Sequence, residues 1–293
     1  MASACNKQSI VSDKKPTFSK EKEKPRPRAL TLSLISISAA LYAVAIAITS
    51  PIPTPWGVGH FRPGVVVPAF FSIVFGSIVG GVGAAIGCFI GDLALYLFGL
   101  TTPLLSLVAG VPGNFVGFYL LGWFVSKKHS LASFILGNLI ALIVGNLVAA
   151  LGVLAYFWFI DPDWALWPME LKFGIVMGLT LFWLTTMIVF VVPLVPILVR
   201  CIEPRLTRIG VRGVSNLSWG SPIGLVKSSV IVSLILTATY ILVVFVPGGN
   251  LLFAGVVPPE LLLLASAVTF VSGIFFAMLA QRLEKSWPAI NQE

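Results

Sequence analysis

Long apolar runs separated by proline, glycine or charge constrain this chain more than any other feature of its sequence. They lie at about residues 29–50, 64–76, 77–99, 104–125, 131–160, 171–199, 226–246 and 261–280. A run of roughly 20 apolar residues is long enough to cross a bilayer as a helix. The chain is 57% hydrophobic and 10% charged, with a mean hydropathy of +0.99, which excludes a soluble domain with a wet surface. We therefore expect an all-α polytopic membrane bundle of about eight transmembrane helices.

The run at residues 64–76 is the weakest of the eight candidates. Its roughly 13 residues rise only about 20 Å along a helix, whereas the hydrocarbon core of a bilayer is about 30 Å thick. Two interpretations stay open: the helix borrows length from the preceding loop, or the segment is re-entrant.

The distribution of lysine and arginine orients these spans. The net charge is +8, but the basic residues are not spread evenly, so membrane topology explains them better than nucleic-acid binding. If all eight runs cross and residues 1–28 lie inside, only Arg62 and Lys172 fall on the outer side. By the positive-inside rule we expect a multi-pass protein of the plasma membrane with both termini cytoplasmic.

Composition divides the chain into five segments. Residues 1–28 are polar, charged and proline-bearing, which predicts a disordered, basic cytosolic tail. Residues 29–200 hold six spans, and residues 201–225 form a basic cytosolic loop. Residues 226–282 form an additional two-helix hairpin, and residues 283–293 form a cytosolic tail.

No catalytic, cofactor-binding or metal-binding motif is present in the sequence. The two histidines fall on opposite sides of the membrane in this topology, and the three cysteines have no metal-ligand spacing. The closest match to a nucleotide-binding loop, GSPIGLVKSS at residues 220–229, lacks the glycine that must precede the lysine. We therefore expect a protein that is not an enzyme, and any ATP that transport needs must be hydrolysed by another chain.

Two apolar runs carry small residues four apart, a spacing that lets helix backbones approach closely. These residues are Gly83, Gly87 and Gly91 in the third run and Ala39, Ala43 and Ala47 in the first. For the glycines, packing within this chain is the simpler interpretation. For the alanines, internal packing and contact with an external partner stay equally open.

Polar side chains within the apolar runs are few, and each is a candidate for ligand binding because hydrocarbon disfavours it. The candidates are Asp92, Asn114, Asn146 and Lys172. Asn138 lies eight residues before Asn146, so the two are only about 80° apart around a helix and both can face inward. Hydrogen bonding between helices is the alternative role for the asparagines.

The first predicted outer loop, SPIPTPWGVGHFRPG at residues 50–64, combines four prolines with three side chains suited to ligand binding. These are the indole of Trp56, the titratable ring of His60 and the fixed cation of Arg62. The loop either closes over a ligand or anchors its side chains at the lipid headgroups.

Three stretches resemble the substrate-binding S component of the energy-coupling factor (ECF) vitamin transporters. They are SAALYAVAIA, FRPGVVVPAFFSIVFGSIVGGVGAAIGCFIGDL and VPGNFVGFYLLGW, and the resemblance covers about residues 30–200. It implies a six-helix S-component-like core that binds a vitamin-like small molecule near the outer face. The implied partners are a transmembrane coupling subunit, which would dock on Ala39, Ala43 and Ala47, and two ATPase subunits.

The resemblance also implies how the binding site is built. Trp56, His60 and Arg62 would help to form a lid, and the outer halves of the fourth, fifth and sixth spans would line the pocket. The last two spans have no counterpart in the six-helix unit, so they are either an accessory hairpin or a site for another subunit. The ligand's charge stays open, because Arg62 and Lys172 suit an anion, Asp92 suits a cation and aromatic rings suit a flat ring.

A stand-alone secondary transporter is the alternative function. Such a protein needs a path for protons or ions, and Asp92 is the only acid clearly within a span. An intramembrane enzyme is disfavoured because a catalytic cluster is missing from the sequence.

Overall fold

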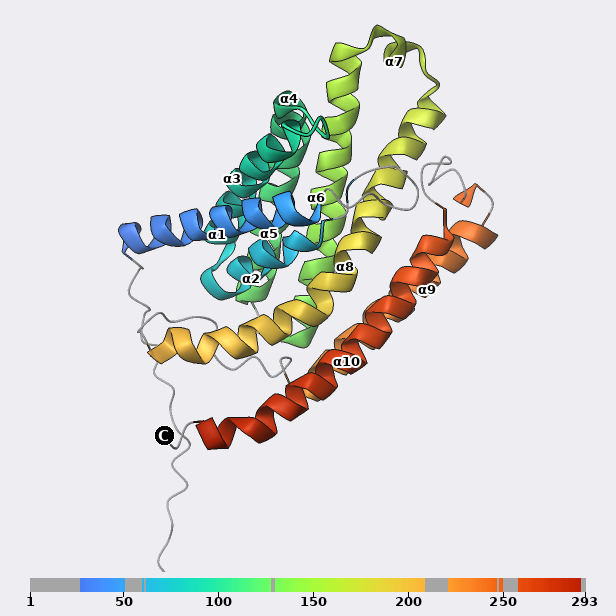
Figure 1. Cartoon of the computed structure of the whole chain (residues 1–293). Helices are drawn as coiled ribbons and strands as arrows, with labels where there is room; N and C mark the ends of the chain where they lie inside the picture. Colours follow the sequence, from blue (N-terminus) through green and yellow to red (C-terminus); the bar gives the residue numbers. More distant parts are fainter. Residues whose placement is uncertain are drawn as a thin grey trace, which may run out of the picture.

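The structure is a computed structural model, and it describes residues 27–50, 60, 62–127, 130–208, 221–246, 248–249 and 258–290 (Figure 1). Residues 1–26 of the predicted tail, Trp56 and residues 209–220 of the predicted basic loop lie outside the described residues. Every regular element in the described ranges is a helix, and seven of the helices are long and apolar enough to cross a membrane. The prediction of an all-α polytopic bundle is confirmed.

The long helices coincide with the predicted apolar runs. They are α1 (Arg28–Thr49), α3 (Ser77–Tyr96), α5 (Val111–Lys127), α6 (Leu131–Ile160), α8 (Met169–Arg208), α9 (Pro222–Phe245) and α10 (Glu260–Ile290). The short turns α4 (Pro103–Leu105) and η2 (Ser106–Gly110) run directly into α5, and α7 (Pro162–Leu166) links α6 to α8. Two helices continue past the ends of their predicted runs, α8 to residue 208 instead of 199 and α10 to residue 290 instead of 280.

The second apolar run forms η1 (Pro63–Val65) and α2 (Val66–Phe75), a helical segment shorter than the seven candidate spans. The turn η1 extends α2 by three residues, of which only Pro63 precedes the predicted run. Nine of the ten residues of α2 are buried, so the protein itself surrounds this helix. The chain then turns at Gly76, whose φ of +95° is a left-handed conformation that other residues rarely adopt. Because α3 starts at the next residue, α2 and α3 form a tight corner.

The helices pack mostly in chain order. α1 lies along α3, α3 along α5, α5 along α6 and α6 along α8, while α2 contacts α1, α3, α5 and α8 (Figure 1). The α9–α10 hairpin packs on the outside of this group, chiefly through contacts of α10 with α8. The residues that match the predicted six-span core therefore form one bundle, with the hairpin beside it.

The glycines of α3 allow α1 to approach closely. A Cβ atom at Gly87 would lie 2.7 Å from the carbonyl oxygen of Ala39, and one at Gly91 would lie 2.8 Å from Cβ of Ile46. Any side chain there would push the two helices apart, because van der Waals contact needs more room than this. The interpretation that these glycines serve packing within the chain is confirmed.

Helix α8 changes direction along its length, as the yellow ribbon in Figure 1 shows. Pro193 and Pro196 lie within this helix. Proline has no backbone N–H and its ring clashes with the carbonyl group one turn earlier, so it bends the helices that contain it. The bend directs the end of α8 beneath the bundle and away from α6 (Figure 1).

The α9–α10 hairpin is held by hydroxyl groups. The Ser233 hydroxyl donates to the carbonyl oxygen of Ser266 at 2.9 Å, and the Ser266 hydroxyl donates to the carbonyl oxygen of Ser233 at 2.8 Å. Thr237 Oγ1 lies 2.9 Å from Ser266 Oγ in the same seam. Small residues and hydroxyl hydrogen bonds are the usual means of holding transmembrane helices together, so the hairpin is a tightly packed unit.

Candidate functional site

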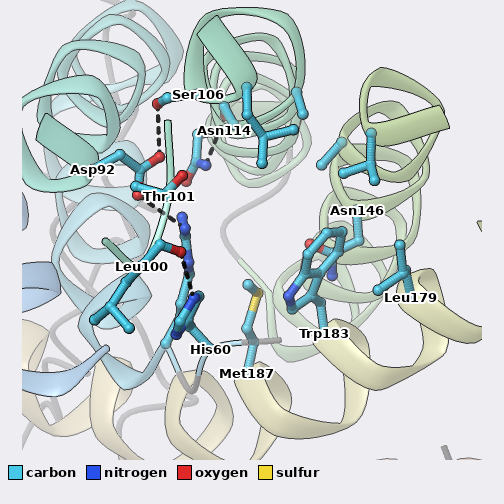
Figure 2. A pocket seen from close by; sticks show the side chains of 16 residues that line it. His60, Asp92, Leu100, Thr101, Ser106, Asn114, Asn146, Leu179, Trp183 and Met187 are labelled. Carbon is cyan, nitrogen blue, oxygen red and sulfur yellow. Dashed lines mark hydrogen bonds and ion pairs between the residues drawn. The ribbon is translucent and has the colours of Figure 1, made fainter. Parts of the chain in front are cut away.

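A cavity of about 220 Å³ lies between the first loop and helices α3, α5, α6 and α8. One wall is polar and holds His60, Asp92, Ser106 and Asn114, whereas Leu179, Trp183 and Met187 of α8 form the opposite wall (Figure 2). Asn146 of α6 lies next to Trp183 in this view. The cavity therefore combines a flat aromatic surface with a few hydrogen-bonding groups, which is typical of small-molecule sites.

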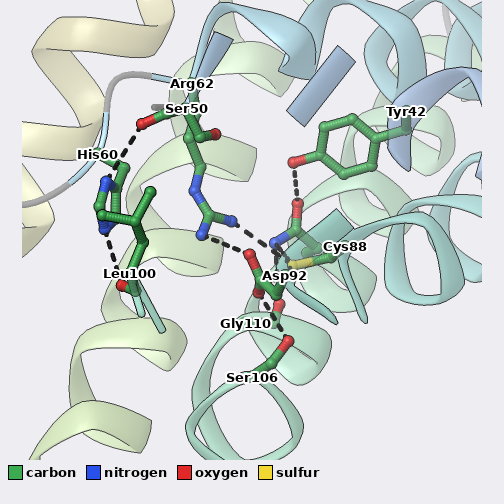
Figure 3. Close-up of polar contacts among 10 residues, drawn as sticks. Tyr42, Ser50, His60, Arg62, Cys88, Asp92, Leu100, Ser106 and Gly110 are labelled. Carbon is green, nitrogen blue, oxygen red and sulfur yellow. Dashed lines mark hydrogen bonds and ion pairs between the residues drawn. The ribbon is translucent and has the colours of Figure 1, made fainter. Parts of the chain in front are cut away.

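The polar wall is organised around the carboxylate of Asp92, which is only 2% exposed. Arg62 Nη2 donates to Asp92 Oδ1 at 2.9 Å, and the hydroxyl of Ser106 donates to Oδ2 at 2.6 Å (Figure 3). The thiol of Cys88, one helical turn before Asp92, lies 3.4 Å from the same Oδ2 atom. These partners account for a carboxylate in an apolar helix, because a buried charge is tolerated when it is paired and hydrogen-bonded.

Arg62 remains charged at this position. Burial by itself lowers the pKa of the guanidinium, but the nearby Asp92 carboxylate outweighs this effect and raises the pKa above its ordinary value. The positive charge of Arg62 and the negative charge of Asp92 therefore cancel within the cavity wall.

The amide of Asn114 is held in one orientation by three groups. Its Oδ1 accepts a hydrogen bond from the Tyr42 hydroxyl at 2.8 Å, while its Nδ2 donates to the carbonyl oxygen of Gly110 at 2.9 Å. Nδ2 also lies 3.2 Å from Cys88 Sγ (Figure 3). Asn114 thus joins α1, α3 and α5 while it lines the cavity.

The backbone just before Asn114 departs from a regular α-helix. Pro112 lacks an N–H group, so the regular helical hydrogen bonding fails just before it and η2 adopts a wider, π-helical turn. The N–H of Val111 accordingly reaches the carbonyl oxygen of Ser106, five residues earlier. Irregular helix of this kind is tolerated within a membrane where protein surrounds it.

His60 connects two elements at the edge of the cavity. Its Nδ1 lies 3.2 Å from the carbonyl oxygen of Ser50 at the end of α1, and its Nε2 lies 3.1 Å from that of Leu100 after α3 (Figure 3). The described part of the first loop, His60 with Arg62, therefore lies against the cavity and is tied to its rim.

Lys172 lies away from the other candidates. Its Nζ donates to the carbonyl oxygen of Ala165 at 3.1 Å and lies 4.5 Å from the centre of the Trp158 ring. It does not line the cavity, and only 4% of the residue is exposed. These contacts give it a role in closing the α6–α7–α8 corner, where cation and ring attract each other.

The alanines of α1 are divided between two environments. Ala39 and Ala43 are 3% and 7% exposed and lie on the side of α1 that packs against α3, whereas Ala47 is half-buried. An external partner reaches Ala39 and Ala43 only if α1 moves away from α3.

The cavity also contains residues that were not among the predicted site residues. Trp183, Leu179 and Met187 look like ordinary span residues, because apolar side chains in an apolar run carry no individual signal. Trp183 has one unusual property in the sequence, since it lies deep in a span while tryptophan prefers the membrane interface. Ser106 could not be predicted from the sequence, because its hydrogen bond to Asp92 depends on the π-helical turn.

Comparison with known proteins identifies the family. The model of the ECF-type riboflavin transporter, S component, matches residues 28–196. The chain belongs to this family. No curated protein and no solved structure matches the chain.

The region matched by the S-component family contains every residue that lines the cavity. It begins at the start of α1 and ends at Pro196 within α8, so the α9–α10 hairpin lies beyond it. This confirms the predicted resemblance and the two additional C-terminal helices. Membership of the family makes the chain a multi-pass membrane protein with the role of a vitamin-binding transport subunit. Within the described ranges, no group of three or more His, Cys, Asp or Glu side chains is placed to hold a metal ion.

Proposed function

We propose that this chain binds riboflavin, or a closely related uncharged flavin, in the 220 Å³ cavity and presents it to the other subunits of an ECF importer. The observation that carries the proposal is the lining of the cavity within the matched region. Trp183 offers a flat surface for a ring system, and the amides of Asn114 and Asn146 offer hydrogen bonds to its polar edge.

The charge of the lining supports an uncharged ligand. Among the described residues that line the cavity, Arg62 and Asp92 are the only Lys, Arg, Asp or Glu residues, and they pair with each other at 2.9 Å. An anionic ligand would have to separate this pair or remain unpaired, and both are costly at a buried site. Lys172, the other candidate for an anion, has its own partners outside the cavity.

The size of the cavity requires some adjustment on binding. Ligand pockets usually have volumes of about 300 to 1,000 Å³, above the 220 Å³ found here. Met187 lines the cavity, and its unbranched side chain changes shape at little cost. We therefore expect the α8 wall to move outward when a flavin enters.

The pairing of Asp92 with Arg62 argues against the alternative function, a stand-alone secondary transporter. That alternative depended on Asp92 as an acid able to carry a proton or ion. Because Asp92 accepts hydrogen bonds from Arg62 and Ser106, its charge already has partners, and the geometry favours a structural role.

For the partners, we propose that the chain works with a transmembrane coupling subunit and two ATPase subunits. Contact through the partly exposed Ala47 side of α1 is compatible with the present packing, whereas Ala39 and Ala43 would join the interface only after α1 shifts. Tagged protein should recover a coupling subunit and ATPases from its native membrane. Recovery of the chain alone, together with uptake that follows a proton gradient, would contradict this proposal.

Titration of the purified protein with riboflavin, followed by flavin fluorescence, tests the ligand. We expect saturable binding of one flavin per chain and at least tenfold weaker binding of riboflavin 5′-phosphate, because its phosphate adds negative charge to a neutral site. Trp183→Ala should weaken riboflavin binding, whereas Trp123→Ala, at an exposed position outside the cavity, serves as the control. Equal binding of the two flavins would contradict the assignment of an uncharged ligand.

A further inference from the structure

A second, smaller cavity lies beside the proposed flavin site. Its volume is about 30 Å³, and it is enclosed by α5 and α6 with Val65 and Met187. Asn114, Asn146, Ala149 and Met187 line both cavities, so the small cavity adjoins the large one. We call it the deep cavity.

Glycines let α5 and α6 approach each other closely beside the deep cavity. A Cβ atom at Gly113 would lie 2.7 Å from the carbonyl oxygen of Gly145, and one at Gly117 would lie 3.0 Å from that of Ala141. The helices therefore meet backbone to backbone here, and these glycines line the deep cavity together with larger side chains.

Two amide groups line this space without a hydrogen-bond partner. Nδ2 of Asn138 and Nδ2 of Asn146 are both buried, and neither has a hydrogen-bond partner among the described residues. Asn138 is 1% exposed and Asn146 is 7% exposed, and both residues line the deep cavity. Leaving a buried donor unsatisfied is unfavourable, so native proteins nearly always supply an acceptor.

The volume limits what that acceptor can be. A cavity of about 30 Å³ has room for a water molecule or for one polar group of a ligand, since roughly 10 to 15 Å³ suffices for one water. An anion is not favoured, because none of the described residues that line the deep cavity is a cation. The remaining chemistry is an uncharged oxygen that accepts a hydrogen bond from an amide.

We propose that the deep cavity is an acceptor site, in which Asn138 Nδ2 donates to an uncharged oxygen atom. The oxygen belongs either to a ring carbonyl of the ligand, which reaches in past Asn146, or to a bound water molecule. The first source rests on the proposed flavin-binding function, and the second does not.

The test compares Asn138→Leu with the unmodified protein, using full-length chains. Leucine keeps the branched shape of asparagine and removes its donor. Ser229→Ala is the matched control, because Ser229 Oγ is another buried group without a partner and lies in the α9–α10 seam instead. Riboflavin affinity and the melting temperature without ligand are measured for each protein, and Asn138→Val replaces the leucine variant if that variant does not fold.

The two sources give different results. If a ligand carbonyl occupies the site, Asn138→Leu lowers riboflavin affinity at least fivefold, whereas Ser229→Ala leaves it unchanged. If water occupies the site, riboflavin affinity stays within about twofold and the ligand-free melting temperature of Asn138→Leu is equal to or below that of the unmodified protein, because the bound water is lost.

A dry cavity would overturn the proposal. In that case Asn138→Leu removes an unsatisfied donor, so the variant melts several degrees higher and binds riboflavin as before. If the unmodified protein binds no riboflavin, the proposed function fails, but the melting temperature still decides whether an oxygen occupies the deep cavity.

Discussion

At the scale of single residues, Asp92 illustrates how the fold makes an acid acceptable inside an apolar helix. Its partners come from three places: Arg62 in the first loop, Ser106 in the π-helical turn and Cys88 one turn earlier. The sequence predicted that Asp92 and Arg62 belong to the site. It did not predict their pairing, because residues 30 positions apart meet only once α2 and α3 have folded into their corner.

The ion pair predicts strong coupling between Arg62 and Asp92. Arg62→Met or Asp92→Asn alone should each destabilise the protein by about 3 kcal/mol or more, because each leaves a buried charge without its partner. The double variant should lose less stability than the sum of the two single variants. SDS-induced unfolding measures all three, with Asp163→Asn on the exposed turn α7 as the control. Strictly additive losses would show that the two residues do not interact.

At the scale of elements, the seam between α1 and α3 shows what small-residue spacing can predict. The spacing of Gly83, Gly87 and Gly91 predicted a close helix contact within the chain, and the structure identifies α1 as the partner. Spacing could not show that Ala39 and Ala43 face the same seam. Helical periodicity places residues on one face of a helix, but the neighbour that covers the face depends on the whole bundle.

Enlarging Gly87 should therefore separate α1 from α3. Gly87→Val should destabilise the protein by about 1 to 3 kcal/mol or more, since even a Cβ atom would lie 2.7 Å from the carbonyl oxygen of Ala39. The measurement is the thermal melting of the purified variant. Ile90→Val, on the exposed side of α3, is the control and should melt as the unmodified protein does. A stable Gly87→Val variant would contradict this packing.

The α9–α10 hairpin makes a further prediction about elements. None of the described residues beyond Met187 lines the cavity, and the hairpin contacts the bundle mainly at α8. A chain that ends after residue 208 should still fold in a membrane, because lipid can cover the exposed side of α8. Its riboflavin affinity should stay within about threefold of the full chain. A folded, truncated chain that binds no flavin would show that the hairpin shapes the site.

Other features of the elements were beyond prediction from the sequence. The apolar runs predicted where the helices lie, although α8 and α10 continue past the ends of their runs, but the π-helical turn before Pro112 and the bend in α8 arise from local backbone geometry. Trp183 and Met187 face the cavity because of how α8 crosses the bundle. The residues of the apolar wall could therefore be identified only from the structure. Most residues of the polar wall could be predicted from the sequence, because polar side chains are unusual in apolar runs.

At the scale of the whole molecule, the distribution of lysine and arginine supports the proposed orientation of the chain in the membrane. When η1 and α2 together count as one crossing beside the seven longer helices, both termini are cytoplasmic, and Arg62 and Lys172 are the only basic residues on the outer side. The cavity, which contains Arg62, then opens toward the outer half of the membrane, as a capture subunit requires.

This orientation predicts the behaviour of C-terminal fusions. A green fluorescent protein attached after Glu293 should fluoresce, since its C-terminal position would be cytoplasmic. An alkaline phosphatase at the same point should be inactive, because it needs the oxidising outer compartment. An active phosphatase fusion would place the C-terminus outside and contradict the proposed topology.

Mass spectrometry of the small molecule retained by the purified protein tests whether this chain captures an uncharged flavin. We predict riboflavin at about one molecule per chain, and much less of it on Trp183→Ala than on the Trp123→Ala control. Retention of a phosphorylated or otherwise charged compound in place of riboflavin, at the same level on both variants, would contradict it.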